Sequence, residues 1–325
     1  MSGSLTVGDV PGVRVGHWHD LERATGCTVV IPPAGTVGAV EVLGGGASTR
    51  ELELLRPSSP IVGPSAVLLT GGSALGLGAA DGVVRWCASA GLGHAAGAGR
   101  TVVPIVPAAV ILDLFVGSSD AFPGPEEGWL ACEAAREGAH ERGSVGAGAG
   151  ATVGKILGHE GWCKGGVGAA GLRTADGVTV AALAVVNAFG DVIDASGDVL
   201  AGAFEPGVGF VGAARRLIDD PPADPRFDVP QHTTLVCVVT DADLGSVDAS
   251  LVARMSHTGA ARAVSPTATP VDGDVTFALA TGARPANPLR CGVAAAEVTA
   301  EAIRDAVRQA SSVGGVPTAA DRAGA

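Results

Sequence analysis

The chain has 325 residues, of which 47 % are hydrophobic and 17 % charged, and its formal net charge is −12. This apolar content supports a packed core and argues against intrinsic disorder, while an acidic chain without a basic stripe argues against nucleic-acid binding. Because no stretch of about 18 residues is free of charges and of Gly or Pro, and because the N-terminus lacks a basic segment followed by an apolar one, we expect neither a membrane span nor a signal peptide.

The first half of the chain alternates short apolar segments with glycine clusters, a pattern typical of strands joined by tight turns. A helical spacing of apolar residues follows Gly71 and Gly72. We expect strands at Val7–Val15, Cys27–Ile31, Val37–Leu43, Ala66–Thr70 and Val102–Val106, and helices at Leu75–Ala90 and Trp129–Glu137.

A Gly-rich segment, GSVGAGAGATVGK, covers residues 143–155. It fails as a P-loop, because Ala149 stands where the pattern needs Gly and Ile156 follows Lys155 where it needs Ser or Thr. A dinucleotide-binding fingerprint fits only loosely and lacks an acidic ribose partner. We therefore do not expect nucleotide binding.

The second half of the chain contains longer apolar runs, typical of strands that are buried on both faces. We expect strands at Gly165–Leu172, Thr179–Val186, Leu235–Val239 and Val275–Ala280, helices at Gly245–Ala263 and Val293–Ala310, a helix at the end of Phe204–Arg216, and a frayed tail after Ser311. The order of elements predicts an α+β fold, with helices on the outer faces of sheets.

The six cysteines show no CxxC spacing. Without an export signal, we expect reduced thiols in a cytoplasmic protein, each packed as a small apolar side chain. His17 and His19 are the closest histidine pair, and because no second pair of ligands accompanies them we interpret both as loop residues. The sequence therefore predicts no bound metal and no cofactor.

One polar, Pro-rich linker, Asp219–Pro225, stands shortly before His232, Thr233 and Thr234. A threonine that opens a strand is ordinarily explained by its β propensity. Thr233 therefore indicates no chemistry by itself, and only its surroundings give it weight.

Those surroundings resemble a known family, the self-processing L-aminopeptidase/D-esterase and β-aminopeptidase type, which includes the 6-aminohexanoate-oligomer (nylon oligomer) hydrolases. The resemblance runs nearly from end to end and rests on nine motifs that occur in order. They are DVPGVRVGH from Asp9, TGCTVV from Thr25, LTGGSALGLGAADGVVRW from Leu69, VPIVPAAVILDL from Val103, the Gly-rich segment, KGGVG from Lys164, VNAFGDV from Val186, TTLVCVVTDADL from Thr233 and DGDVTFALATG from Asp272.

The resemblance implies a four-layer α/β/β/α sandwich of the N-terminal-nucleophile type. It implies that the precursor cuts itself between His232 and Thr233, giving an α part of residues 1–232 and a β part of residues 233–325 that stay in one domain. The new α-amine and the hydroxyl of Thr233 would then form the catalytic centre. An α-amine titrates at about 7.7–8.0, so it can act as a base near neutral pH.

The same resemblance assigns roles to four other residues by position. Lys164 is expected beside the nucleophile, where a cation would favour the neutral amine. Asn187 is expected to donate its amide to the oxyanion. Asp272 and Asp274, two residues apart, are expected to share one face of a strand and to hold the amine of Thr233 or of a substrate.

The chain departs from the family pattern at two points. His232 precedes the cut, where Asn or Gly is commoner, and the chain has no Tyr to serve as the family's second oxyanion donor. That role is left vacant or is taken by a backbone N–H or a water. Two adjacent threonines also make Thr234 an alternative nucleophile.

The resemblance thus predicts an amide hydrolase that releases N-terminal amino acyl groups from short peptides or amides through an acyl-enzyme. The alternatives are an acyltransferase with the same threonine and a processing-dead binding or scaffold protein. As partners we expect a small peptide or amide substrate and further copies of the chain, in a dimer or tetramer, but neither nucleic acid nor membrane.

Overall fold

The computed structural model describes residues 5–219 and 232–324. Two five-stranded sheets dominate these residues. In the order of hydrogen-bonded neighbours, sheet A contains β1 (Arg14–Asp20), β2 (Thr25–Ile31), β5 (Val67–Thr70), β8 (Ala108–Val110) and β4 (Thr49–Arg50). Sheet B contains β11 (Gly166–Arg173), β12 (Thr179–Asn187), β17 (Thr233–Asp243), β19 (Val275–Pro285) and β3 (Val37–Val42).

The other elements are short strands and seven helices within the described ranges. The short strands are β6 (His94–Ala96), β7 (Thr101–Val103), β9 (Thr152–Val153), β10 (Cys163–Lys164), β13 (Asp191–Ile193), β14 (Val199–Ala201), β15 (Phe204–Glu205), β16 (Gly209–Phe210) and β18 (Val264–Ser265). The helices are α1 (Ser73–Gly76), α2 (Ala79–Ser89), α3 (Pro125–Ala134), α4 (Ala213–Asp219), α5 (Ser246–Ala260), α6 (Pro288–Arg308) and α7 (Ala319–Ala323).

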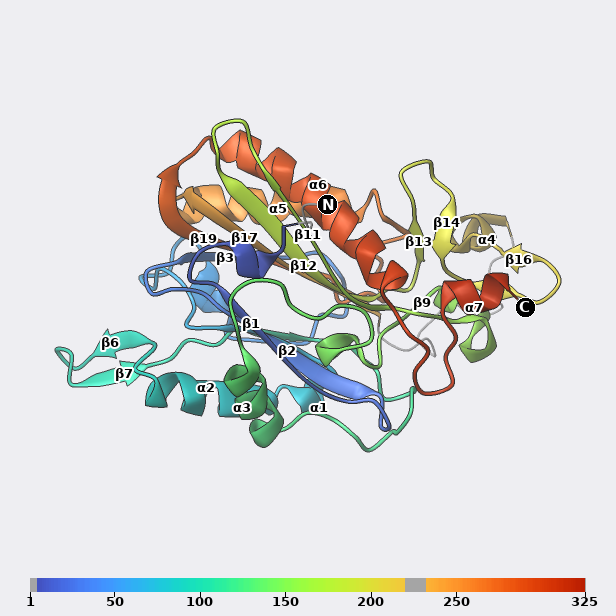
Figure 1. Ribbon diagram of the computed structural model, residues 1–325, viewed down its shortest axis with the longest axis horizontal. Coiled ribbons are helices and arrows are strands. Elements are labelled where there is room, and N and C mark those ends of the chain that lie inside the picture. Colours follow the sequence, from blue (N-terminus) through green and yellow to red (C-terminus); the bar gives the residue numbers. More distant parts are fainter. Residues whose placement is uncertain (1–4, 220–231, 325) are drawn as a thin grey trace.

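The two large sheets stack face to face, and helices cover both outer faces (Figure 1). Between the sheets, side chains such as Leu69 of β5 meet Leu183 of β12 and Phe277 of β19 in one buried cluster. Helices α5 and α6 pack on the other face of sheet B, and α2 and α3 pack on the other face of sheet A. The predicted four-layer sandwich with two stacked sheets is therefore confirmed.

Strand β17 occupies the centre of sheet B. It runs antiparallel to β12 and parallel to β19, and all of its residues except Asp243 are buried. A strand covered on both faces has no reason to alternate polar and apolar residues, which explains the continuous run from Leu235 to Val239. The first residue of this central strand is Thr233, so the fold places it at one end of a strand that is buried along ten of its eleven residues.

Two predicted strands in the first half have different bounds in the structure. Val7–Val15 contains a 3₁₀ turn at Val7–Asp9, and β1 begins only at Arg14, because Gly12 with its φ of +79° reverses the chain between them. His17 and His19 consequently lie on β1 and not in a loop. Val102–Val106 covers only the end of β7, since Pro104 and Pro107 lack the N–H that would extend a ladder.

Two helical predictions are also corrected. Helix α3 begins at Pro125 rather than at Trp129, with Pro at its first position, where no hydrogen bond from its nitrogen is needed. The tail after Ser311, expected to fray, contains α7. Arg322 of this helix donates to the carbonyl oxygens of Glu160 and Trp162 at 2.6 and 2.9 Å, which fastens the tail to the chain before β10.

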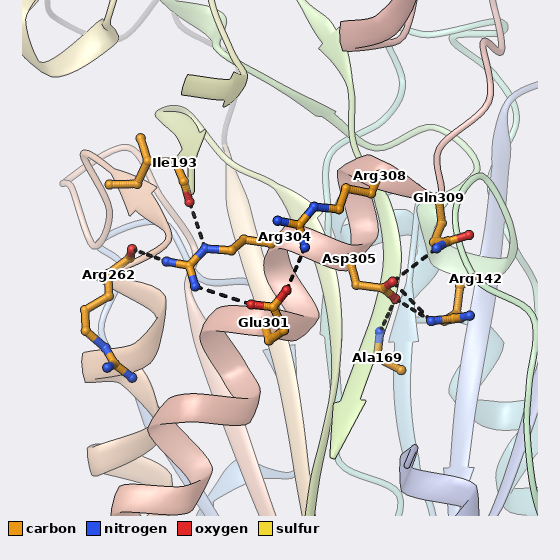
Figure 2. Close-up of polar contacts among 9 residues, drawn as sticks. All are labelled: Arg142, Ala169, Ile193, Arg262, Glu301, Arg304, Asp305, Arg308 and Gln309. Atoms are coloured by element: carbon orange, nitrogen blue, oxygen red, sulfur yellow. Dashed lines mark hydrogen bonds and ion pairs between the residues drawn. The ribbon is translucent and has the colours of Figure 1, made fainter. Parts of the chain in front are cut away.

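Helix α6 is fastened to its neighbours by charged side chains (Figure 2). The carboxylate of Asp305 accepts hydrogen bonds from the Arg142 guanidinium at 3.1 Å and from the backbone N–H of Ala169 in β11 at 3.0 Å. The neighbouring Arg304, 8 % exposed, donates to two backbone carbonyl groups at 3.0 Å. These contacts fix the rotation of α6 on sheet B.

All six cysteines are buried free thiols, as the sequence predicts. Within the described ranges, no helix is long and apolar enough to cross a membrane. The predicted linker Asp219–Pro225 lies outside the described residues except for Asp219.

Candidate active site

Thr233 lies at the end of β17, opposite Asn187 at the end of β12. Its side chain is almost fully enclosed, with 3 % of the residue exposed. The Thr233 hydroxyl donates a hydrogen bond of 2.5 Å to the carbonyl oxygen of His232. The hydroxyl therefore lies directly beside the carbonyl group that self-cleavage would attack.

The His232 carbonyl oxygen has a second donor, the backbone N–H of Gly273, at 2.5 Å. A Cβ at position 273 would lie 2.8 Å from the Thr233 hydroxyl oxygen, so only glycine allows the loop this close. Both donors polarise the carbonyl group, and the Gly273 N–H can stabilise the negative charge that develops on its oxygen when the Thr233 hydroxyl attacks. This arrangement suits acyl transfer at the 232–233 bond.

The side chain of His232 is completely buried. Its ring lies 5.1 Å from the ring of Phe189, measured between centroids, and its backbone N–H donates to the carbonyl oxygen of Val271 at 3.1 Å. Burial, with a smaller effect of the nearby Lys155 charge, lowers the pKa of His232 to about 2. The ring is therefore neutral at every pH at which the protein is expected to work.

Asn187 is oriented by two donors on its side-chain oxygen, the backbone N–H of Thr152 at 3.0 Å and the ammonium of Lys155 at 2.7 Å. This fixes the amide nitrogen on the opposite side, where it donates a long 3.3 Å bond to the carbonyl oxygen of Leu112. The residue pairs with Thr233 in the ladder between β12 and β17, so its amide nitrogen is a candidate for the oxyanion role implied by the resemblance.

Lys155 is a residue of this site that the sequence reasoning did not propose. It is 4 % exposed, and its ammonium binds both the side-chain oxygen and, at 3.2 Å, the backbone carbonyl of Asn187. Burial lowers its pKa to about 7, against the opposing effect of Asp272 and Asp113. The rarity of lysine could have pointed to Lys155, because Lys155 and Lys164 are the only lysines in the chain.

Lys164 has a different environment from the one expected. It is fully buried, and its ammonium donates to the carbonyl oxygens of Gly148 and Ala151 in the Gly-rich segment at 2.9 and 2.8 Å. Within the described part of the chain, none of its hydrogen bonds reaches Thr233. Burial lowers its pKa to about 7, opposed by the charge of Asp113. Lys164 therefore holds the Gly-rich segment in place beside the site.

Asp274 anchors the residue after the nucleophile. One carboxylate oxygen accepts the backbone N–H of Thr234 at 2.6 Å, and the other accepts from Thr267 and from Ala268 at 2.8 and 2.9 Å. Burial raises its pKa, although these donors oppose the shift. Its role in the structure is to fix the start of β17.

The backbone of Asp272 pairs with that of His232 in an isolated parallel β-bridge. Its carboxylate accepts hydrogen bonds from Thr269 and from the backbone N–H of Phe189, the latter at 3.3 Å. Burial and the charge of Asp274 raise its pKa to about 6. The two aspartates interact, as expected, but they precede β19, which begins at Val275. Their proximity comes from the loop and not from a shared strand face.

Asp113 is a second buried ionisable group that the sequence reasoning did not single out. Its carboxylate accepts from the Thr25 hydroxyl at 2.8 Å and from the Gly72 N–H at 2.7 Å. Burial raises its pKa to about 6, while the charge of Lys164 opposes the shift. It lies next to Leu112, whose carbonyl contacts Asn187, and so connects sheet A with the site.

The site contains a hydroxyl nucleophile, two candidate oxyanion donors and buried charges of both signs, which is the equipment of covalent acyl transfer. Within the described ranges, no group of three or more His, Cys, Asp or Glu side chains could hold a metal ion. The reacting groups identified here are all supplied by the chain itself.

Comparisons with known proteins agree with this chemistry. The model of peptidase family S58 matches residues 6–320. A protein of Mycobacterium tuberculosis named as an uncharacterized aminopeptidase is 40 % identical over 347 residues, which cover 97 % of each chain. The 6-aminohexanoate-oligomer endohydrolase of Paenarthrobacter ureafaciens is 31 % identical over 84 % of this chain and 74 % of its own.

The fold also has a solved counterpart. The structure of the L-aminopeptidase D-Ala-esterase/amidase of Ochrobactrum anthropi, described as a variant of the Ntn hydrolase fold, superimposes with a TM-score of 0.72 at 20 % identity. The match covers 98 % of this chain and 91 % of that one. At this identity the likeness supports the fold alone.

Proposed function

This chain belongs to peptidase family S58 and is a hydrolase of peptide or amide bonds, and from that premise we propose that it activates itself by cleaving the His232–Thr233 bond. The observation that carries the proposal is the carbonyl of His232, whose oxygen accepts hydrogen bonds from the Thr233 hydroxyl and from the Gly273 N–H, both at 2.5 Å. The nucleophile and one oxyanion donor are therefore already at the bond to be broken.

In the proposed cleavage, the Thr233 hydroxyl oxygen bonds to the His232 carbonyl carbon, the C–N bond breaks, and the hydroxyl proton passes to the departing nitrogen. Water then hydrolyses the ester, leaving a carboxylate on His232 and a free α-amine on Thr233. The Gly273 N–H supplies the donor that the family pattern takes from a Tyr, which this chain lacks. We prefer Thr233 to Thr234, because the hydroxyl of Thr234 has no hydrogen-bond partner in the part of the chain that the structure describes.

In turnover, we propose that the α-amine of Thr233 takes the proton of its own hydroxyl, which attacks the substrate carbonyl and forms an acyl-enzyme. Asn187, oriented by Lys155, would donate to the oxyanion. Lys164 would keep the Gly-rich segment in place. Asp274 would fix the strand start, and with Asp272 it would hold the amine of a substrate.

The proposed substrates are short peptides or amides with a free N-terminal amine, from which an amino acyl group is released. The buried, acidic pair Asp272 and Asp274 supports this, since a buried cation needs a paired charge. The names of the aminopeptidase and oligomer-hydrolase relatives support the same class of bond.

We further propose that the two parts remain one domain after cleavage. The β part supplies β17 and β19, and the α part supplies the strands on both sides of them, β12 and β3. Separation of the two parts would break the hydrogen-bonded ladders between β12 and β17 and between β19 and β3. The six free thiols support a reducing compartment, for which we propose the cytoplasm.

A homo-oligomer, a dimer or tetramer, is also proposed. Helices α5 and α6 pack against each other, and both begin with apolar side chains on the outer face. Val247 and Leu251 of α5 and Leu289 and Val293 of α6 are each between 47 and 66 % exposed. Apolar groups gathered in this way are typical of a surface that a partner covers.

The mass of the purified protein under denaturing conditions tests the proposed cleavage. We expect two fragments, the second beginning at Thr233, in place of a single 31.7 kDa chain. Thr233→Ala should stay whole and inactive, because both the nucleophile and the later base are lost. Thr234→Val, a matched change one residue away, should cleave normally. Cleavage of Thr233→Ala, or a second fragment that begins elsewhere, would contradict the proposal.

A further inference from the structure

The ring of His232 fills a closed pocket beside the bond to be cleaved. It is completely buried against Phe189, and among the described residues neither ring nitrogen has a hydrogen-bond partner. Buried polar atoms are nearly always paired, so a ring left without partners asks for an explanation other than stability. The pocket accommodates the shape of the ring without using its polar atoms.

The chemistry of self-cleavage connects this pocket with catalysis. When the Thr233 hydroxyl attacks the preceding carbonyl, the C–N bond is exchanged for a C–O bond and a proton moves to the freed nitrogen. The product carries an acyl group on the Thr233 oxygen beside a free α-amine. An acyl-enzyme formed from a substrate is the same kind of species, with the substrate's residue in the place of His232.

The residues around the His232 ring determine which side chains the pocket can bind. The ring of Phe189 offers a flat apolar surface. The charge of Lys155 acts on the ring and disfavours a second cation. Within the described residues, no hydrogen bond joins the ring to the carboxylate of Asp272, which accepts from Thr269 and from the Phe189 N–H. A flat uncharged group keeps the contacts of the ring, whereas a side-chain ammonium would lose its hydration beside the charge of Lys155.

We propose that the pocket which holds the His232 ring in the precursor is the acyl side-chain subsite of the mature enzyme, and that it selects flat, uncharged side chains over cationic ones. The inference rests on the proposed self-cleaving function and names its substrate class: amides and short peptides with an aromatic N-terminal residue. An imidazole and a phenyl ring should both fit, because the pocket offers no partner to the ring nitrogens.

Hydrolysis of phenylalanyl and lysyl amides by the cleaved enzyme tests this inference. We expect kcat/KM for the phenylalanyl amide to exceed that for the lysyl amide by at least about tenfold, the usual discrimination of an apolar pocket. Phe189→Ala should abolish most of this preference. Phe210→Ala, which removes the same ring from β16, should retain it.

Self-cleavage provides a second readout that needs no added substrate. His232→Phe should cleave at least about tenfold faster than His232→Lys. Equal rates for these two variants, or equal hydrolysis of both amides by a cleaved enzyme, would overturn the subsite and leave the proposed function standing. A native chain that stays whole and hydrolyses neither amide would overturn the proposed function, and the subsite with it.

Discussion

Lys155 and Lys164 are the only lysines of the chain, and both are buried around the candidate site. Burial lowers the pKa of each to about 7, so each can exchange its proton near neutral pH. Arginine could not do this, because its guanidinium stays charged, and its larger planar group would not fit among the carbonyl oxygens that Lys164 contacts. The exclusive use of arginine elsewhere indicates that these two positions require an amine.

Gly273 is the position at which one added carbon should matter most. In Gly273→Ala, the new Cβ would meet the Thr233 hydroxyl oxygen at 2.8 Å and push it from the carbonyl it attacks. We expect self-cleavage to slow by roughly 10- to 100-fold, the usual cost of displacing a reacting group by about an ångström. The fraction of uncut chain over time, from denaturing gels, measures the effect.

The control for this change is Gly245→Ala, at a position where a Cβ meets nothing within 4 Å. Equal cleavage rates of the two variants would show that the close approach of Gly273 has no part in the reaction.

Among the elements, α6 shows how the outer layer is fixed to the sheet that carries the nucleophile. Its buried stripe covers β11 and β12, which explains its regular apolar spacing in the sequence. That spacing alone would allow the helix to slide or rotate on an apolar sheet. The polar contacts of Asp305 remove this freedom (Figure 2).

Asp305→Ala should therefore destabilise the protein by about 1–3 kcal/mol, because it leaves the Ala169 N–H and the Arg142 guanidinium without their acceptor. Urea denaturation of the native and variant proteins measures this difference. Glu297 also lies on α6, where it forms an exposed ion pair with Arg262. Glu297→Ala should cost at most about 1 kcal/mol. If Glu297→Ala lost as much stability as Asp305→Ala, the contacts of Asp305 would have no special part in fixing α6 to the sheet.

On the scale of the whole molecule, buried ionisable groups lie where the layers meet, and they give stability two opposing dependences on pH. Burial and the neighbouring His140 lower the pKa of His17 to about 3, so its contribution is complete above about pH 6.5 and is lost as the pH falls toward 3. Burial raises the pKa of Asp113 and Asp272 to about 6. Their contribution is complete below about pH 4 and is lost as the pH rises through 6.

A variant that cannot titrate separates these contributions. His17→Gln should lose less stability between pH 7 and pH 4.5 than the native protein does, by roughly 2–3 kcal/mol, because the unfolded native chain gains a proton at this position and the folded chain does not. Urea denaturation at the two pH values provides the measurement. The exposed His94→Gln should follow the native protein, and an identical response of His17→Gln would show that His17 does not contribute.

The local sequence patterns determined the strands and the covering helix from which the layers are built. Continuous apolar runs such as Thr179–Val186 and Leu235–Val239 predicted strands buried on both faces, and the spacing within Val293–Ala310 predicted a covering helix; all three are present. Local pattern suffices here because burial of apolar surface acts on every residue of such a run. The bounds were less certain where Pro and Gly interrupt the pattern, as at Pro104 and Gly12.

The contacts of the site were decided only by the tertiary structure. The family resemblance singled out Thr233 and Asn187 but gave no distance between them, and it expected Lys164 beside the nucleophile, whereas Lys155 is the lysine that contacts Asn187. It also gave no reason to notice that Gly273 approaches the Thr233 hydroxyl. Such contacts join segments far apart in the chain, and they depend on the register of β17 between β12 and β19, which no local pattern encodes.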